Sequence, residues 1–203
     1  MLVSEADKKR ITTAIATAEQ RTSGEIFCVI ARQSDDYRLV PIVWAATLAL
    51  LLPLPLLFLT TLPAKLIYLA QLIVFIVAAL MLSWPPIRFR IVPRRKMHEE
   101  AHAEALRQFI AQGLQKTEQR TGVLIFASEA EHYAEIIADA GINAKVNPEV
   151  WDGAVAALIA GIRNGQPAEG FMAAIEQCSA VLSQHFPPGA LNRNELPDKL
   201  IEI

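Results

Sequence analysis

Residues 39–64 read LVPIVWAATLALLLPLPLLFLTTLPA and residues 66–87 read LIYLAQLIVFIVAALMLSWPPI, and only Lys65 separates these two uncharged runs. About 20 predominantly apolar residues in a helix cross the hydrocarbon core of a bilayer, so each run is long enough for one span. Neither run shows the polar stripe at helical spacing that a helix on a soluble core would carry. The sequence therefore predicts a transmembrane helical hairpin over residues 39–87.

Two alternatives to a straight two-span hairpin stay open at this stage. A buried pair of core helices in a soluble protein could also contain two long apolar runs. In addition, Pro53 and Pro55 lie inside the first run, and a proline within a helix removes a backbone hydrogen bond and can bend the helix. The first run is therefore expected either to be a kinked span or to enter and leave the membrane on the same side.

A basic cluster after the second run predicts the orientation of the hairpin. Five cationic residues follow the run within nine positions, whereas the turn at residues 60–65 carries only Lys65. Because Lys and Arg accumulate on the cytoplasmic side of membrane proteins, we expect the soluble part and both termini to lie in the cytoplasm, at the inner cell membrane. The residues expected at the membrane interface are Trp44, Trp84, Arg88, Arg90, Arg94, Arg95 and Lys96.

The two halves of the chain differ in charge. Residues 1–98 carry 12 Lys and Arg against six Asp and Glu, whereas residues 99–203 carry seven against 15. Nucleic acid is a poor partner for such a chain, because no basic face spans the domain to displace counterions from phosphates. The expected partners are the lipid bilayer and either another membrane protein or a second copy of this chain.

The segments on both sides of the hairpin predict one α/β domain, because helical and strand-like patterns alternate there. The fold class expected is a small mixed β-sheet sandwiched by helices, with the hairpin inserted after the first strand. Helices are expected over residues 5–21, 98–117, 149–163 and 167–186, and strands over residues 25–31, 122–127, 133–138 and, in fourth place, 143–146.

The first strand has to pair with strands beyond residue 120, so the hairpin interrupts a single domain and both parts of that domain lie on one face of the membrane. The organisation expected in chain order is the first part of the domain (1–38), the transmembrane hairpin (39–87), a basic neck (88–97), the remainder of the domain (98–188) and an extended C-terminal arm with a short helical end (189–203).

Several segments resemble the TPM domain family, whose members include thylakoid, photosystem-repair and receptor-modulating proteins. The bacterial integral-membrane branch of the family is the most similar. The segments that carry the resemblance are TSGEI (22–26), RTGVLIF (120–126), EIIADAGI (135–142), the helix around Trp151 and GFMAAI (170–175) with the HFP that follows at 185–187.

The resemblance implies an α/β/α sandwich. It also implies that the activity lies among those known in the family, where some members are acid phosphatases or calcium binders and others are assembly or auxiliary factors. The better-known members usually carry the domain outside the cytoplasm with one C-terminal anchor. This chain departs from that pattern, because its expected anchor interrupts the domain.

Carboxylates are the candidates for a cation site. Glu25 and Asp139 are expected at the ends of neighbouring strands, and Asp152 in an adjoining loop. Oxygen ligands of this kind suit Ca²⁺ or Mg²⁺. No Lys or Arg is expected beside these acids to clamp a phosphate, which disfavours a divalent-cation-dependent (acid) phosphatase.

The segment from His98 to His102 matches the H-E-x-x-H pattern of zinc metalloproteases. On a helix, His98 and His102 would share one face and bind zinc, while Glu99 would activate water. The pattern still needs a third ligand, and a solvated first helical turn beside the bilayer is the favoured interpretation. Zinc proteolysis is therefore a remote alternative.

Cys28 and Cys178 are expected to be buried, reduced thiols, although spacing alone leaves a disulfide or a metal pair open. No nucleophile with a matching His and acid is recognisable, so an enzyme is not the favoured interpretation. The function predicted is a membrane-tethered interaction module that acts as an accessory, assembly or quality-control factor for membrane proteins.

Overall fold

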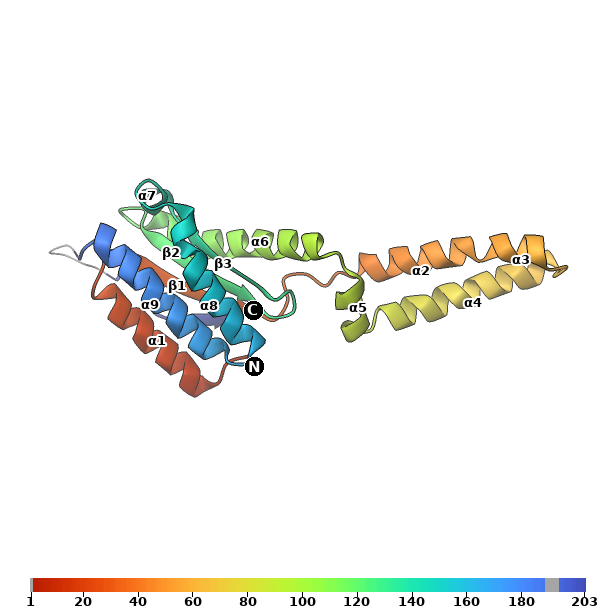
Figure 1. The fold of residues 1–203 in the computed structure, drawn as a ribbon, viewed down its shortest axis with the longest axis horizontal. Coiled ribbons are helices and arrows are strands. Elements are labelled where there is room, and N and C mark those ends of the chain that lie inside the picture. The colour runs from red at the N-terminus through yellow and green to blue at the C-terminus, as the bar shows by residue number, and fades with distance from the viewer. Residues whose placement is uncertain (1, 189–193) are drawn as a thin grey trace. The chain divides into compact units, whose positions relative to one another are not determined.

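A computed structural model of the chain describes residues 2–188 and 194–203 and divides into two compact units (Figure 1). The first unit, here called the body, comprises Met1–Ser34 and His98–Ile203. The second, here called the hairpin unit, is Asp35–Met97. The hairpin unit is thus an insertion in the sequence of the body, directly after the first strand.

The body is built on a four-stranded mixed sheet with the strand order β3-β2-β1-β4. β1 is parallel to both of its neighbours, whereas β2 and β3 form an antiparallel hairpin. The strands are β1 (Glu25–Ala31), β2 (Gly122–Ser128), β3 (Tyr133–Ala138) and β4 (Leu200–Glu202).

Helices cover both faces of the sheet, so the predicted α/β sandwich is confirmed. Every residue of β1 and β2 is buried, which is typical of central strands with two covered faces. Alternate residues of each strand point to opposite faces. Ile26, Cys28 and Ile30 pack under α1, α8 and α9, whereas Phe27 and Val29 pack against α6.

The helices begin and end close to the predicted positions, except α6, which begins at Arg94 instead of residue 98. Gly113 adopts φ +77°, a left-handed conformation that suits glycine, and it ends the helix predicted to reach residue 117 earlier than expected. The helical segments of the body are α1 (Glu5–Glu19), α6 (Arg94–Ala111, in the body from His98 onward), η1 (Leu114–Lys116), α7 (Ala140–Asn143), η2 (Pro148–Trp151), α8 (Asp152–Arg163) and α9 (Pro167–His185).

Two expectations about the smaller elements are wrong. Residues 143–146 do not form a strand, because Asp139 caps a short helix, α7, that leads directly into this stretch. The fourth strand comes instead from the C-terminal arm, where Leu200–Glu202 pairs in parallel with β1 in place of the expected helical end. Residues 189–193 of the predicted arm lie outside the described residues.

The hairpin unit contains two long helical stretches that pack against each other. The first is divided at Leu52, because Pro53 and Pro55 occupy the first turn of α3 and supply no backbone N–H to the preceding turn. Leu52 itself keeps helical dihedral angles. The backbone therefore stays helical at the point where the prolines predicted a kink. The helices are α2 (Leu39–Leu51), α3 (Pro53–Leu59), α4 (Ala64–Leu82) and α5 (Pro85–Ile91).

Candidate functional site

Glu25 and Asp139 lie at the same end of the sheet but not on neighbouring strands. Glu25 starts β1 opposite Gly122 of β2, and the backbone N–H of Asp139, just after β3, donates to the Gly122 carbonyl at 2.9 Å. Because β2 lies between β1 and β3, the expectation of adjacent strands is wrong. The two acids belong to different polar groups at this end of the sheet.

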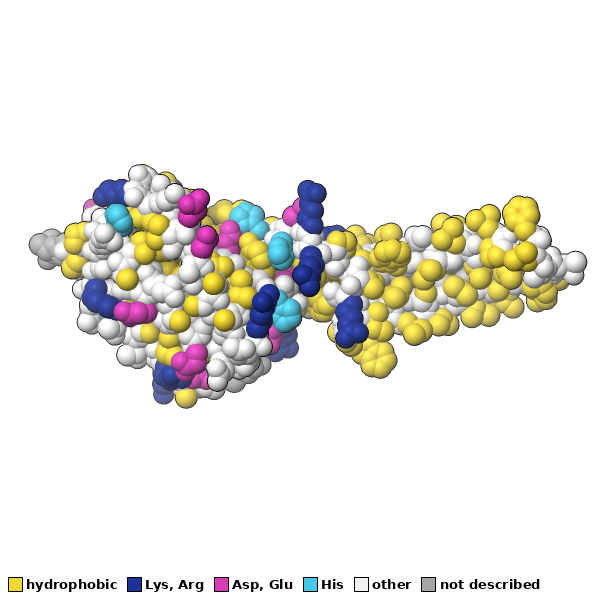
Figure 2. Space-filling model, viewed as in Figure 1, with side chains coloured by type: hydrophobic (Ala, Val, Ile, Leu, Met, Phe, Trp, Pro, Cys, Tyr) yellow, Lys and Arg dark blue, Asp and Glu magenta, His cyan; other side chains and the backbone are white. Residues whose placement is uncertain are grey.

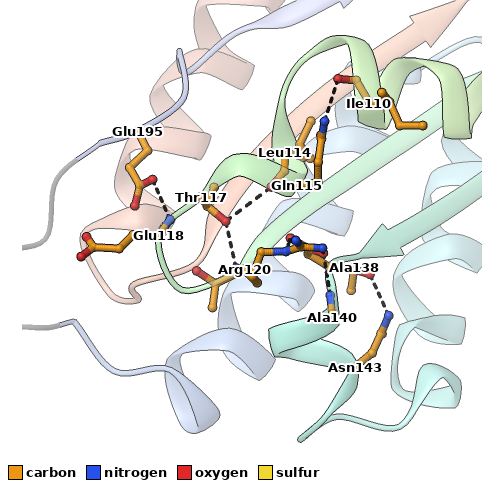
Figure 3. Close-up of polar contacts among 12 residues, drawn as sticks. Ile110, Leu114, Gln115, Thr117, Glu118, Arg120, Ala138, Ala140, Asn143 and Glu195 are labelled. Atoms are coloured by element: carbon orange, nitrogen blue, oxygen red, sulfur yellow. Dashed lines mark hydrogen bonds and ion pairs between the residues drawn. The ribbon is translucent and has the colours of Figure 1, made fainter.

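Asp139 is paired with Arg120, which Figure 3 shows next to Ala140. The guanidinium donates from Nε to Oδ2 at 2.7 Å and from Nη2 to Oδ1 at 2.9 Å, and the Ala140 N–H donates to Oδ1 at 2.7 Å. The Asp139 side chain is 4% exposed and that of Arg120 is 52% exposed. The expectation that no basic group lies beside the acids is therefore wrong, and both oxygens of Asp139 already accept hydrogen bonds.

The loop that carries Arg120 is held tightly against α7. Arg120 adopts φ +56°, which is uncommon for a residue with a side chain, and its carbonyl accepts the N–H of Gly141 at 3.1 Å. A Cβ added to Gly141 would lie 2.5 Å from the carbonyl oxygen of Gln119. Glycine is therefore required at residue 141 for the loop to approach, and this approach aims the Arg120 side chain at Asp139.

We expect Arg120→Met to destabilise the body more than Asp139→Asn. Without Arg120, the buried Asp139 carboxylate keeps only one hydrogen-bond donor among those described above, whereas an unpaired Arg120 can be hydrated at the surface. Thermal unfolding in detergent should show the melting temperature of Arg120→Met lowered by roughly 5 °C.

The double variant Arg120→Met/Asp139→Asn is the control for this asymmetry. It removes the unpaired carboxylate of Asp139, so it should recover part of the fall in melting temperature. Equal melting temperatures for Arg120→Met and the unmodified protein would contradict a stabilising role for the pair.

A second polar group, here called the carboxylate pocket, lies at the start of β1. It is a cavity of about 220 Å³ lined by Glu19, Glu25, Asp198, Ala16, Gln20 and Asn194. Oε1 of Glu19 accepts the N–H of Ile26 at 2.8 Å, and Oε2 of Glu25 accepts the N–H of Leu196 at 3.1 Å. The Glu19 carboxyl group therefore joins the end of α1 to β1, and the Glu25 carboxyl group joins β1 to the C-terminal arm.

Burial changes the ionisation of the two glutamates in the carboxylate pocket. It raises the pKa of Glu19 to about 9, and the nearby Glu25 and Asp198 charges add to this shift. Burial also raises the pKa of Glu25. Glu19 therefore keeps its proton at neutral pH, and the pocket carries less negative charge than its composition suggests.

The three predicted cation ligands are not gathered into one site. Glu25 lines the carboxylate pocket, Asp139 is paired with Arg120, and Asp152 is an exposed residue at the start of α8. Within residues 2–188 and 194–203, no group of three or more His, Cys, Asp or Glu side chains is arranged to hold a metal ion. A Ca²⁺ or Mg²⁺ site at these residues stays a prediction.

The histidines of the H-E-x-x-H segment contact β3. The ring of His98 lies 5.3 Å from that of Tyr133, and Nδ1 of His102 lies 2.9 Å from Oε2 of Glu135. The Tyr133 hydroxyl donates to the same oxygen at 3.0 Å. The side chains thus contact the sheet, and the described residues supply no set of three metal ligands here.

The thiols of Cys28 and Cys178 are free and fully buried, which confirms the prediction for both residues. Cys28 lies in the middle of β1 and Cys178 on the inner face of α9, in the same core cluster.

The hairpin unit exposes the apolar side chains of its helices (Figure 2). Phe58 and Leu59 are 83% and 81% exposed, and Trp44 and Trp84 are 50% and 66% exposed. A separate small cluster of Tyr37, Val92 and Met97 forms the buried core of this unit. Of the predicted interfacial cations, Arg88 and Arg90 lie in α5, whereas Arg94, Arg95 and Lys96 begin α6.

Comparisons with known proteins agree with the fold. Residues 85–181 match the family model of the TPM domain. Among solved structures, the NMR structure of the BA42 protein from the psychrophilic bacterium Bizionia argentinensis is similar, with a TM-score of 0.63 and 19% sequence identity over 99% of this chain and 95% of that chain. No curated protein matches the chain.

Proposed function

We propose that the chain carries a TPM domain, the family whose model matches residues 85–181, and that its hairpin of residues 39–87 tethers this domain to a membrane. In this proposal the body is an interaction module, and the protein is an accessory or assembly factor for membrane proteins.

The observation that carries the proposal is the exposure of the hairpin's apolar surface. Leu39–Leu59 and Ala64–Leu82 are each long and apolar enough to cross a membrane, and only 11% and 6% of their most apolar stretches are buried. Core helices of a soluble protein with this composition would be mostly buried. An apolar surface of this extent in water would promote aggregation, whereas hydrocarbon solvates it.

The positions of the aromatic and basic residues support an orientation. Trp44 lies near the start of the first helix and Trp84 just after the end of α4, where indoles suit the membrane interface. The cations follow immediately after Trp84, whereas the turn between the helices carries Lys65 alone. We therefore propose that the body and the chain ends are cytoplasmic and that residues 60–65 are outside.

Labelling of single cysteines tests the membrane topology. With a membrane-impermeant maleimide, Thr61→Cys should react in intact spheroplasts, whereas Gln184→Cys on the body should react only after permeabilisation. The unmodified chain is the control, because Cys28 and Cys178 are fully buried and should stay unlabelled.

Each alternative gives a different labelling result. If Thr61→Cys reacted only after permeabilisation, the hairpin would be re-entrant. If the protein stayed in the soluble fraction after lysis, the tethering proposal would fail.

A divalent-cation-dependent phosphatase is the second candidate. The matching family model carries the name TPM phosphatase, and the carboxylate pocket is the feature that favours this activity. The interaction role ranks first because Asp139 is occupied by Arg120 and none of the described residues that line the pocket is basic. Mg²⁺-dependent hydrolysis of p-nitrophenyl phosphate that is lost in Glu25→Gln, with the melting temperature unchanged, would reverse this ranking.

A further inference from the structure

Gln71 is a polar side chain inside the apolar helix α4. Between residues 66 and 82, only Gln71 and Tyr68 carry side chains with hydrogen-bonding N–H or O–H groups. Gln71 is half-buried, and its amide makes no hydrogen bond with any residue that the structure describes. By contrast, Thr47 of α2 is satisfied within its own helix, because its hydroxyl donates to the Val43 carbonyl at 2.8 Å.

The position of Gln71 places the unbonded amide deep in the proposed membrane span. Gln71 follows Ala64 by seven residues and precedes Leu82 by 11, so it lies about 10 Å and 16 Å from the two ends of α4 at ~1.5 Å per residue. An amide without a hydrogen-bond partner is unfavourable in hydrocarbon, where no water is present to replace the partner. The span is therefore expected to gain stability from a polar contact at this depth.

Gln71 lines an apolar groove between α2 and α4. The groove has a volume of about 290 Å³, and its other lining residues are Ala46, Ala49, Leu50, Tyr68, Leu72 and Phe75. Small residues such as Ala46 and Ala49 permit a second helix to approach closely. An acyl chain could occupy the groove, but it could not form a hydrogen bond with the amide.

We propose that this groove binds the hairpin of a second copy of the chain, with the two Gln71 amides hydrogen-bonded to each other. The proposal rests on the proposed membrane tether. Two copies inserted in the same direction are related by a two-fold axis along the membrane normal, so their Gln71 residues lie at the same depth. Each amide has one donor group and one acceptor, and two related amides can therefore satisfy each other reciprocally. A different membrane protein would need its own polar group at this depth.

Energy transfer between labelled copies of the full chain tests the pairing. Protein labelled at Gln184→Cys with donor or acceptor is reconstituted in vesicles of phosphatidylethanolamine and phosphatidylglycerol and diluted with lipid. We expect Gln71→Leu to weaken self-association about five- to thirtyfold, the range found for polar contacts between membrane helices. Thr47→Val is the matched control and should leave the association unchanged.

The outcomes separate the two proposals. If the protein floats with the vesicles but Gln71→Leu associates as strongly as the unmodified chain, the pairing through Gln71 is wrong and lipid or another partner fills the groove. The same conclusion follows if no energy transfer above random proximity is seen in any variant. If the protein does not float with the vesicles, the membrane tether itself fails.

Discussion

Gly161→Ala is expected to lower the free energy of unfolding of the body by roughly 3 kcal/mol, because it overpacks the crossing of α8 and α9. A Cβ at Gly161 would lie 2.6 Å from Cα and 2.7 Å from N of Gly170, which are backbone atoms that no rotamer change can move. The helices would have to separate, although alanine is intrinsically the better helix former. Thermal unfolding should show a fall in melting temperature of about 6–12 °C.

The same helix offers a matched control for this change. Gly153→Ala also adds one methyl group to α8, but the nearest atom is Oε1 of Gln177 at 2.8 Å, at the end of a flexible side chain. This variant should unfold at the same temperature as the unmodified protein or slightly higher. Equal losses for both variants would contradict the close approach of Gly161 and Gly170.

The glycine pair matters for the stability of the body because α8 and α9 cover one face of the sheet. Phe171 and Ile175 of α9 and Leu158 of α8 pack in the same core as Ile26 and Ile125. Separation of the two helices would therefore loosen the sheet whose end carries both polar groups.

Patterns within short stretches of sequence predicted most of the fold. The central strands are continuous apolar runs and the helices have a clear apolar face, so their positions follow from local periodicity. β4 was missed because three residues are too few to show an alternation and its partner, β1, lies about 170 residues earlier. α7 was missed although Asp139 is a good N-cap residue, because residues 143–146 were assigned to a strand instead.

The polar groups were predicted only in part, because they too depend on contacts between residues that are far apart in the sequence. Glu25 and Asp139 were expected to be functional, but their partners come from distant parts of the chain. The antiparallel pairing of Val123 with Ala138 places Arg120 beside Asp139, and this could have been deduced once β2 and β3 were assigned. The burial of Glu19 could not have been deduced in this way. It depends on the C-terminal arm, which brings Asp198 to the same pocket.

Glu19→Gln is expected to stabilise the protein by up to about 5 kcal/mol at pH 8. The folded state binds a proton at Glu19 with a pKa of about 9, whereas the ordinary value is 4.5. Between these values the unfolded chain binds fewer protons than the folded one, so the free energy of unfolding falls as the pH rises. Glutamine keeps the oxygen that accepts the Ile26 N–H and cannot ionise, so the variant does not incur this loss.

Melting temperatures measured from pH 6 to pH 8.5 test this expectation. The unmodified protein should lose stability more steeply than Glu19→Gln, so the advantage of the variant should grow with pH. Glu129→Gln removes an exposed carboxylate and should follow the unmodified protein. Parallel curves for all three proteins would show that Glu19 is ionised in the folded state. In that case the carboxylate pocket would hold more negative charge at neutral pH, and a divalent cation would no longer have to displace a proton to bind there.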